Sequence, residues 1–206
     1  MLTARGSTSE LEPSDDALWV RARGGDAEAF AGLFERHSQA IYNFCFRRTA
    51  DWSLVEDLMS IVFLEAWRRR CKELPLGMVR AWLFGIATFV VRNRRRTELR
   101  YRRALARLPR ESTTPDFAGD VEARLTDESR MAVLLEQLRT LPAREQDVLA
   151  LCVWSEFSYE EAAVARAIPV GTVRSRLSRA RSRLRELTAT SGHEGGEQAS
   201  TVRRSS

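Results

Sequence analysis

The sequence predicts an all-α protein in which a flexible linker joins two small helical domains. Apolar residues recur at helical spacing, residues that favour helix N-caps precede several of these stretches, and no stretch has a convincing strand pattern. We expect an N-terminal extension with a short helix over residues 1–25 and a first domain over 26–107. The linker is predicted over 108–126, a second domain over 127–187, and a disordered tail over 188–206.

The elements of the first half follow from cap residues and breakers. Ser14 can cap a short helix that ends at Gly24 and Gly25, and Asp26 can cap the next helix. Asp51 opens a third helix. Apolar residues of the second and third helices repeat at helical spacing: Phe30, Leu33, Phe34, Ile41 and Phe44, then Val55, Leu58, Val62, Phe63 and Trp67.

A long helix is predicted from about residue 78 to 107, after a break at Pro75 and Gly77. Its first half is apolar and its second half is rich in arginine. Residues 109–127 contain prolines, a glycine and a Ser-Thr-Thr run without a sustained apolar period, which is typical of a linker. The tail from residue 188 is rich in Gly, Ser and Glu, a composition that favours disorder.

The second half begins with an apolar-periodic segment over residues 127–139. Pro142 suits the first position of a helix over 142–154. Ser158 and Glu161 form a capping-box pattern that opens a helix over 158–166. After a break at Ile168 and Pro169, the last helix is predicted over 170–187.

The helices over 158–166 and 170–187, separated by a short turn, have the form of a helix-turn-helix. Ala167 stands in that turn, where glycine is common. In the second helix Val173, Leu177, Ala180, Leu184 and Leu187 recur at steps of four and three and should form a buried stripe. The other face, which can read bases and phosphates in a major groove, carries Thr172, Arg174, Ser175, Arg176, Ser178 and Arg179. A helical hairpin without a DNA function has the same spacing, but the arginine-rich face argues against it.

Charge is segregated along the chain, which holds 33 Lys and Arg residues against 28 Asp and Glu, with Lys72 as its one lysine. Residues 77–107 contain nine arginines and one acid, and residues 166–185 contain seven arginines and no acid. Residues 111–128 between them contain six acids and one arginine. A solvated helix face usually mixes both signs, so the two basic blocks indicate two nucleic-acid contacts.

Two sets of motifs resemble a known family. The string Ser158-Tyr-Glu-Glu-Ala-Ala with Ile168-Pro-Val-Gly-Thr-Val-Arg-Ser-Arg-Leu-Ser-Arg-Ala-Arg resembles region 4 of extracytoplasmic-function (ECF) sigma factors, in the sigma-70 family. Leu141-Pro-Ala-Arg-Glu-Gln-Asp-Val-Leu resembles the helix that precedes it. In the first half, Glu56-Asp57-Leu58, Val62-Phe63-Leu64, Ala66-Trp67 and Arg80-Ala-Trp82-Leu83 resemble region 2.

The resemblance implies a dissociable specificity subunit of bacterial RNA polymerase that is cytoplasmic and is not itself an enzyme. Region 2 is expected to bind the β′ clamp helices and to recognise and melt the −10 element. Region 4 is expected to bind the β flap and to read the −35 duplex. An anti-sigma factor is implied as a further partner, and the loop over residues 71–78 is implied to grip a flipped −10 base.

Candidate site residues follow from combining the resemblance with the chemistry of the side chains. Stacking aromatics and cations suit single-stranded DNA, so the −10 candidates are Arg80, Trp82, Phe89, Arg92, Asn93, Arg95 and Arg96. Trp82 is equally compatible with the core. The third helix has apolar residues on more than one side, so part of it should remain exposed to a partner. The core-polymerase candidates are Glu56, Asp57, Leu58, Ile61, Phe63, Glu65 and Trp67.

Two other function classes can be compared with the sequence features. An operator-binding repressor or activator could use the same helix-turn-helix, but no stretch resembles a ligand-binding or dimerisation domain. An enzyme would need a phosphate loop, a nucleophile motif or clustered His and carboxylates, and the sequence offers none of these patterns. We therefore expect no catalytic residues, no cofactor and no metal. The longest apolar run, residues 81–91, is far short of the roughly 20 residues that span a bilayer, so no membrane insertion is expected.

Overall fold

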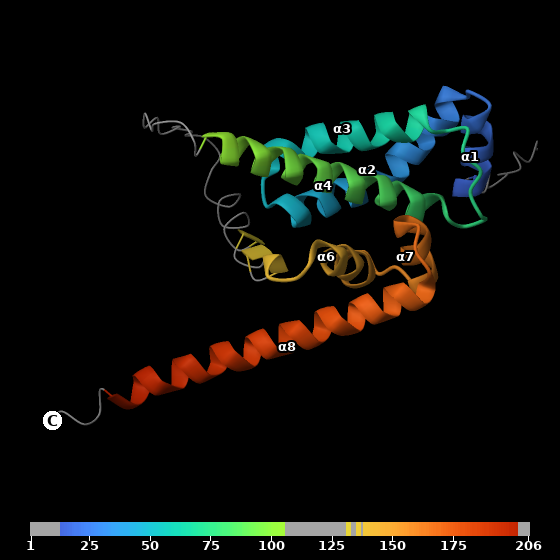
Figure 1. Ribbon diagram of the computed structural model, residues 1–206. Helices are drawn as coiled ribbons and strands as arrows, with labels where there is room; N and C mark the ends of the chain where they lie inside the picture. Colours follow the sequence, from blue (N-terminus) through green and yellow to red (C-terminus); the bar gives the residue numbers. More distant parts are fainter. Residues whose placement is uncertain (1–12, 106–130, 133–134, 137, 202–206) are drawn as a thin grey trace, which may run out of the picture.

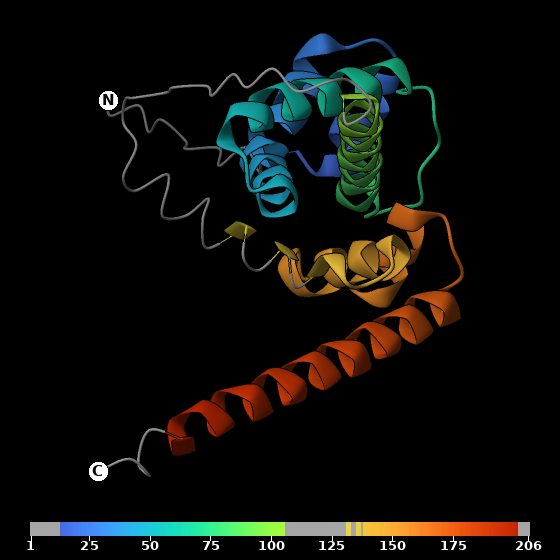
Figure 2. The same ribbon diagram turned by 60° about the vertical axis from the view of Figure 1, so that its left-hand side comes forward.

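The computed structural model describes residues 13–105, 131–132, 135–136 and 138–201, and this part of the chain is built from helices without a strand (Figure 1). An N-terminal bundle contains α1 (Asp15–Arg23), α2 (Ala27–Thr49), α3 (Trp52–Arg68) and α4 (Val79–Leu105). Beneath α4 lie α6 (Ala143–Leu149), the π-helical turn η1 (Ala150–Trp154) and α7 (Tyr159–Arg166). The long helix α8 (Val170–Thr201) forms the outermost layer, as Figure 2 shows from another side.

Cap residues set the starts of the first three helices, as predicted. Ser14 accepts a hydrogen bond from the Ala17 amide at 3.2 Å, and Asp26 accepts one from the Ala29 amide at 3.0 Å. The Asp26 pKa is lowered by this backbone hydrogen bond and by its bond from Arg21. Each cap satisfies an amide that has no partner within its helix.

The second half follows its predicted breaks, but the helix predicted over 142–154 is divided into α6 and the π-helical turn η1. Pro142 is the N-cap of α6 rather than its first helical residue. Ser158 and Glu161 form both hydrogen bonds of the capping box at the start of α7. Ala167 ends α7 with φ +49°, so an alanine takes the left-handed conformation that glycine usually supplies in this turn.

Helix α8 buries the predicted stripe as far as Leu184, because Val173, Leu177 and Ala180 are buried and Leu184 is half-buried. The side chain of Leu187, the last residue of that stripe, lies outside the described part of the structure. The helix was predicted to end near residue 187 and to be followed by a disordered tail. The structure instead continues α8 to Thr201. Residues 188–201 contain no proline that would interrupt the helix. The prediction of disorder was based only on their glycines and polar residues.

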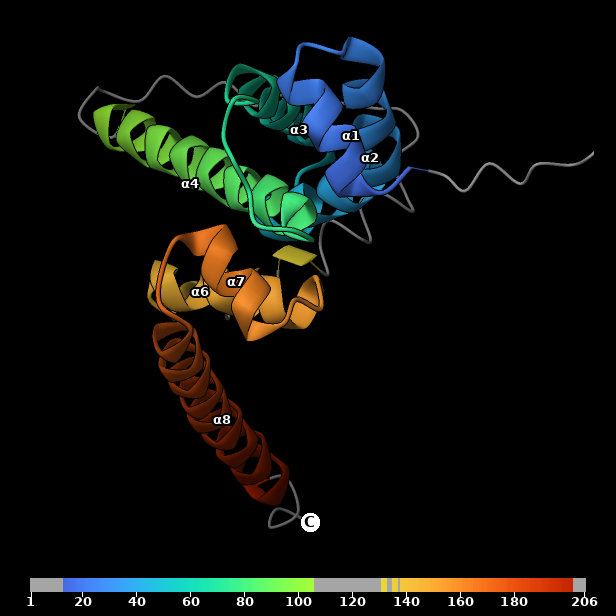
Figure 3. The same ribbon diagram turned by 90° about the vertical axis from the view of Figure 1, so that its right-hand side faces the viewer.

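One apolar core runs through both halves of the chain. Phe84 of α4 packs edge-on against Phe157 of the loop before α7, with ring centroids 4.9 Å apart. Gly85 of α4 lets α4 and α7 approach closely, since a Cβ at this position would lie 2.4 Å from the Ala165 carbonyl oxygen of α7. The N-terminal bundle (α1–α4) and the C-terminal unit (α6–α8) therefore pack together (Figure 3). The predicted linker over 108–126 lies outside the described residues.

Candidate nucleic-acid interface

The recognition face predicted on α8 is open to solvent. Arg174, Ser175, Ser178 and Arg179 are exposed, and Thr172 and Arg176 are half-exposed. The exposure of this face follows from the helical period, because the apolar stripe on the other side of α8 is buried. Arg174 lies over the Tyr159 ring of α7 at 5.7 Å, and Arg179 donates to the Ser175 carbonyl oxygen at 3.2 Å. The face presents guanidinium and hydroxyl groups, which can contact base edges and phosphates.

Four of the −10 candidates meet on α4. Phe89, Arg92, Asn93 and Arg96 line a cavity of about 160 Å³ together with Arg166 of α7. Phe89 is 56% exposed and Arg69 lies 5.9 Å from its ring centre. An exposed aromatic ring among cations is the combination that stacks on a base and holds its phosphate.

Trp82 is a core residue, which is one of its two predicted interpretations. It is 6% exposed, and its ring centre lies 4.7 Å from that of Trp19 in α1. The indole of Trp82 therefore has no surface on which a base could stack. The sequence could not distinguish a packing role of Trp82 from a base-stacking role, because an aromatic residue on α4 suits both.

The other basic −10 candidates are engaged by the C-terminal unit. Arg80 donates to the Ser155 carbonyl oxygen at 2.9 Å and lies 4.4 Å from the Phe157 ring centre. Arg95 donates to Gln146 Oε1 at 3.0 Å. Burial and nearby Arg139 lower the pKa of Arg95. Within this arrangement, these guanidinium groups serve as contacts between the two units.

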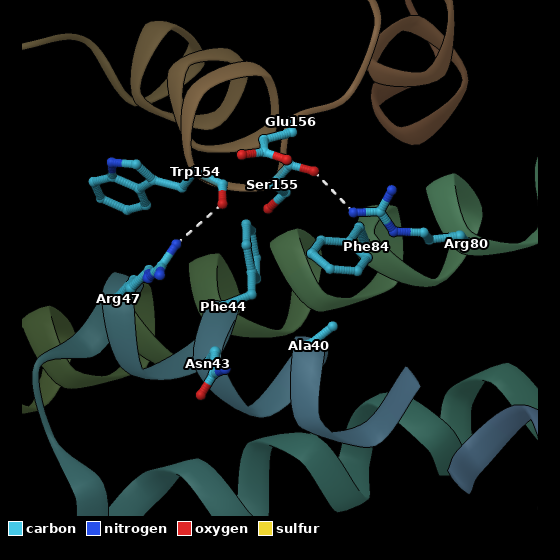
Figure 4. A pocket seen from close by; sticks show the side chains of 9 residues that line it. All are labelled: Ala40, Asn43, Phe44, Arg47, Arg80, Phe84, Trp154, Ser155 and Glu156. Atoms are coloured by element: carbon cyan, nitrogen blue, oxygen red, sulfur yellow. Dashed lines mark hydrogen bonds between the residues drawn. The ribbon is translucent and has the colours of Figure 1, made fainter. Parts of the chain in front are cut away.

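The ends of η1 and α2 add to the same contact. Figure 4 shows a cavity of about 310 Å³ between α2, α4 and η1, with Arg47 and Arg80 directed at backbone carbonyls of η1 and the residue after it. Arg47 donates to the Trp154 carbonyl oxygen at 3.0 Å. Carbonyls at a helix C-terminus lack partners within the helix and carry a partial negative charge, so arginines suit this position.

Asp147 is the centre of the contact between the units, and it was not predicted as a functional residue. It is fully buried in α6 and accepts from Arg48 of α2 at 2.9 Å, Arg92 of α4 at 3.3 Å and Arg166 of α7 at 3.2 Å. Burial lowers the pKa of Arg48 to about 10, against the attraction of Asp147. One carboxylate thus holds three guanidinium groups from three helices. The sequence feature that could have identified Asp147 is an acid at a position where helical spacing predicts an apolar residue, four residues before Leu151.

Helix α3 divides the core-polymerase candidates into two groups. Leu58 and Phe63 are buried and help to hold the bundle. Glu56, Asp57 and Ile61 are exposed, with Ile61 at 45% and its neighbour Leu64 at 47%. Glu65 pairs with Arg68 and Arg69, and Trp67 packs on Phe30. The expected exposed apolar face bordered by acids is therefore present on α3.

This α3 face adjoins the −10 candidates. Ile61, Glu65, Phe89 and Asn93 line one cavity of about 320 Å³ between α3 and α4. A larger groove of about 630 Å³ lies at the end of α2 and the second half of α4. Its arginines, of which the sequence analysis proposed one for DNA, are Arg48, Arg94, Arg95, Arg102 and Arg139. Arg94, Arg95 and Arg102 belong to the basic block over residues 77–107, which thus contributes to a concave surface as well as to a helix face.

The described residues contain no group of three or more His, Cys, Asp or Glu side chains placed to hold a metal ion. None of the described helices is long and apolar enough to cross a membrane.

The chain matches two family models and several characterised relatives. Residues 33–103 match sigma-70 region 2, and residues 129–184 match sigma-70 region 4. The RNA polymerase sigma factor CarQ of Myxococcus xanthus is 33% identical over 169 residues, covering 81% of this chain and 93% of CarQ. HrpL of Pseudomonas syringae pv. syringae, also an RNA polymerase sigma factor, is 32% identical over 72% of this chain and 80% of its own. The ECF sigma factor SigE of Mycolicibacterium smegmatis is 29% identical over 92% of this chain and 75% of its own.

Solved structures share the fold. CnrH in complex with the cytosolic domain of CnrY superposes with a TM-score of 0.64 at 24% identity, covering 86% of this chain and 99% of CnrH. The sigma factor RpoE of Bartonella quintana, in complex with the anti-sigma factor NepR, superposes with a TM-score of 0.55 at 26% identity, covering 78% and 96%. With both regions matched in order, the chain belongs to the ECF group of sigma-70 family RNA polymerase sigma factors, which direct transcription initiation.

Proposed function

We propose that this sigma factor reads the −35 element through α8, reads the melted −10 element through α4 and the loop over residues 71–78, and binds core RNA polymerase through α3 and region 4. It acts in the cytoplasm and performs no catalysis of its own. The observation that carries the proposal is the division of α8 into a buried apolar stripe and an exposed face with Arg174 and Arg179. A helix that needed only to pack would not require an acid-free arginine face.

The −10 assignment rests on Phe89, Arg92, Asn93 and Arg96, which share a cavity on α4. Trp82 is left out of the proposed DNA surface because it is buried. Arg80, Arg92 and Arg95 remain in it as residues that must leave their partners in the C-terminal unit before they can reach DNA.

The core-polymerase assignment rests on the exposed side of α3. Asp57 and Glu56 lie beside the apolar surface of Ile61 and Leu64, which suits a partner with basic and apolar groups. The β′ clamp helices are the proposed partner of α3, and the β flap that of the C-terminal unit. An anti-sigma factor is also proposed, since the related RpoE was solved with one.

The first test is run-off transcription with purified core polymerase on a library of genomic fragments. It should yield discrete promoter-specific transcripts that depend on the sigma factor. Changing Arg174 and Arg179 to alanine should then abolish selection of the −35 element while core binding persists; each lost base contact costs about 1–3 kcal/mol. The control is Arg144→Ala, an exposed arginine on α6. Normal transcription by the double variant would overturn the α8 assignment.

The second test addresses α3. Asp57→Arg combined with Ile61→Asn should weaken core binding, measured by gel filtration of the holoenzyme, with helicity and melting temperature near those of the unmodified protein. Glu35→Arg, a charge reversal at an exposed position of α2, is the control. Unchanged core affinity in the folded double variant would contradict the α3 assignment. Sequence-specific binding of a palindrome without polymerase would favour the repressor alternative instead.

A further inference from the structure

The loop between α3 and α4 is held on one side by α1. Asp16, Trp19 and Arg23 are spaced by three and four residues, so they share one face of α1. All three contact the segment that spans residues 72–77. The contacts are Asp16 to the Gly77 amide at 2.9 and 3.0 Å, Trp19 Nε1 to the Lys72 carbonyl at 3.2 Å, and Arg23 to Glu73 at 3.0 Å.

The first two contacts fix the loop backbone near its two ends. Both carboxylate oxygens of Asp16 accept from the Gly77 amide, and Gly77 has φ +72°, a conformation that favours glycine. Trp19 is 3% exposed and packed on buried Trp82, so its indole N–H is a rigid donor to Lys72. The Arg23–Glu73 pair is exposed and contributes less.

Between these two anchors the loop presents an unusual side chain. Leu76 is 85% exposed, the most exposed of the large apolar residues in the described part of the chain. Arg68, Arg69, Arg70 and Lys72 lie just before it in the chain. An apolar side chain on a fixed backbone, preceded by four cations, suits a flipped-out base whose neighbouring phosphates the cations attract.

We infer that α1 is the positioning element of the base-reading loop, with Asp16 as its main positioning residue and Trp82 acting through Trp19. The inference rests on the proposed function of the loop in reading single-stranded −10 DNA. Asp16 does not touch DNA; it fixes the backbone from which Leu76 projects. Selectivity at one −10 base therefore depends on a carboxylate in the N-terminal helix.

The first turn of α1 supplies a matched control. Asp15 and Asp16 are adjacent acids that interact equally with the helix dipole. Asp15, however, faces α2, where it lies 2.6 Å from both Arg36 and His37. Asp15→Ala therefore weakens the attachment of α1 to the bundle without touching the loop, whereas Asp16→Ala releases the loop.

The experiment is single-round transcription by reconstituted holoenzyme from the protein's own promoter with each −10 base varied in turn. Asp16→Ala should reduce discrimination at one base about tenfold, because a hydrogen bond to a carboxylate is worth at least one such step in an equilibrium constant. Asp16→Asn, which keeps one acceptor oxygen, should retain part of it. Asp15→Ala should retain all of it even where its melting temperature falls. In parallel, hydrogen exchange of the Gly77 amide should accelerate in Asp16→Ala alone.

Leu76→Ser separates failure of this inference from failure of the proposed function. If Leu76→Ser changes discrimination and Asp16→Ala does not, the loop reads DNA but α1 does not position it, and the inference is overturned. If neither variant changes discrimination, the loop does not read the −10 element and the proposed function of the loop fails as well. Equal losses in Asp15→Ala and Asp16→Ala would reduce the role of α1 to general stability and would also overturn the inference.

Discussion

Removing the Asp147 carboxylate should separate the C-terminal unit from the N-terminal bundle. Asp147 is fully buried, and its partner Arg48 is 3% exposed and comes from the other unit. In Asp147→Ala the closed arrangement, in which the two units pack together, would bury the Arg48 charge without a partner. In the separated arrangement, in which they do not pack together, water would solvate that charge. Burial lowers the pKa of Arg48 to about 10 even with the attraction of Asp147, so Arg48 is cationic near pH 7.5 in the unmodified protein. Loss of Asp147 would lower this pKa further in the closed arrangement, which is another form of the same cost.

The size of the effect follows from the burial of the pair. Breaking a buried ion pair by removing one partner costs about 3–5 kcal/mol. Because the cost falls on the contact between the units, the equilibrium between separated and closed forms should shift by about 10²- to 10⁴-fold. Glu136→Ala removes an exposed acid that pairs with Arg139, where the expected change is at most about 1 kcal/mol.

Small-angle X-ray scattering of the free protein is the assay. Asp147→Ala should increase the radius of gyration and split denaturant unfolding into two transitions, whereas Glu136→Ala should do neither. The paired change Arg48→Met with Asp147→Leu should restore much of the compact form, since it removes the most buried guanidinium together with its carboxylate. Arg92 and Arg166 lose the same partner, but their side chains are more exposed than that of Arg48. A compact Asp147→Ala variant with one unchanged unfolding transition would refute the reasoning.

Three further predictions concern other contacts. Gly85→Ala should open the same interface, because the added Cβ would lie 2.4 Å from the Ala165 carbonyl; scattering should show expansion with helicity intact, and an unchanged profile would contradict it. Ser158→Ala should lower the stability of the helix-turn-helix by about 1 kcal/mol in denaturant unfolding, whereas Ser182→Ala on the exposed side of α8 should have little effect. At pH 8 iodoacetamide should modify exposed Cys71 first and Cys45 last by mass spectrometry. Burial raises the Cys45 pKa to about 12, which keeps its thiol protonated until the pH approaches that value; equal rates in the folded protein would refute this order.

Local features of this protein could be predicted from the sequence because the interactions that cause them span few residues. The caps at Ser14, Asp26 and Ser158 act within three residues of themselves, and the stripe through Val173 and Leu177 follows from the helical period. The exposed face on α3 could be predicted for the same reason, since one helix cannot bury all its sides in a small bundle.

Contacts between the two units could not be predicted in this way. Arg48 and Asp147 are 99 residues apart, and nothing in the neighbourhood of either one specifies the other. The arginines of α4 were assigned to DNA because the sequence around a surface cation does not indicate which group the cation will bind. Phosphate, a backbone carbonyl and a buried carboxylate all satisfy a guanidinium group. Only the structure distinguishes Arg92, which pairs with Asp147, from Arg96, which is exposed.

If Arg80 and Arg92 contact DNA as proposed, the same property of arginine links the closed arrangement to promoter binding. Arg92 cannot give the same donors to Asp147 and to a phosphate, and Arg80 cannot remain on the Ser155 carbonyl while it contacts DNA. Each −10 contact by these residues must therefore be made at the expense of a contact between the units. By linkage, a partner that binds only the separated form increases the fraction of molecules in that form. The apparent affinity for −10 DNA rises by the same factor. Core polymerase would act in this way if α3 and region 4 bind sites farther apart than the closed form allows. In that case the buried Asp147 would set how much of the binding energy of polymerase is used to expose α4.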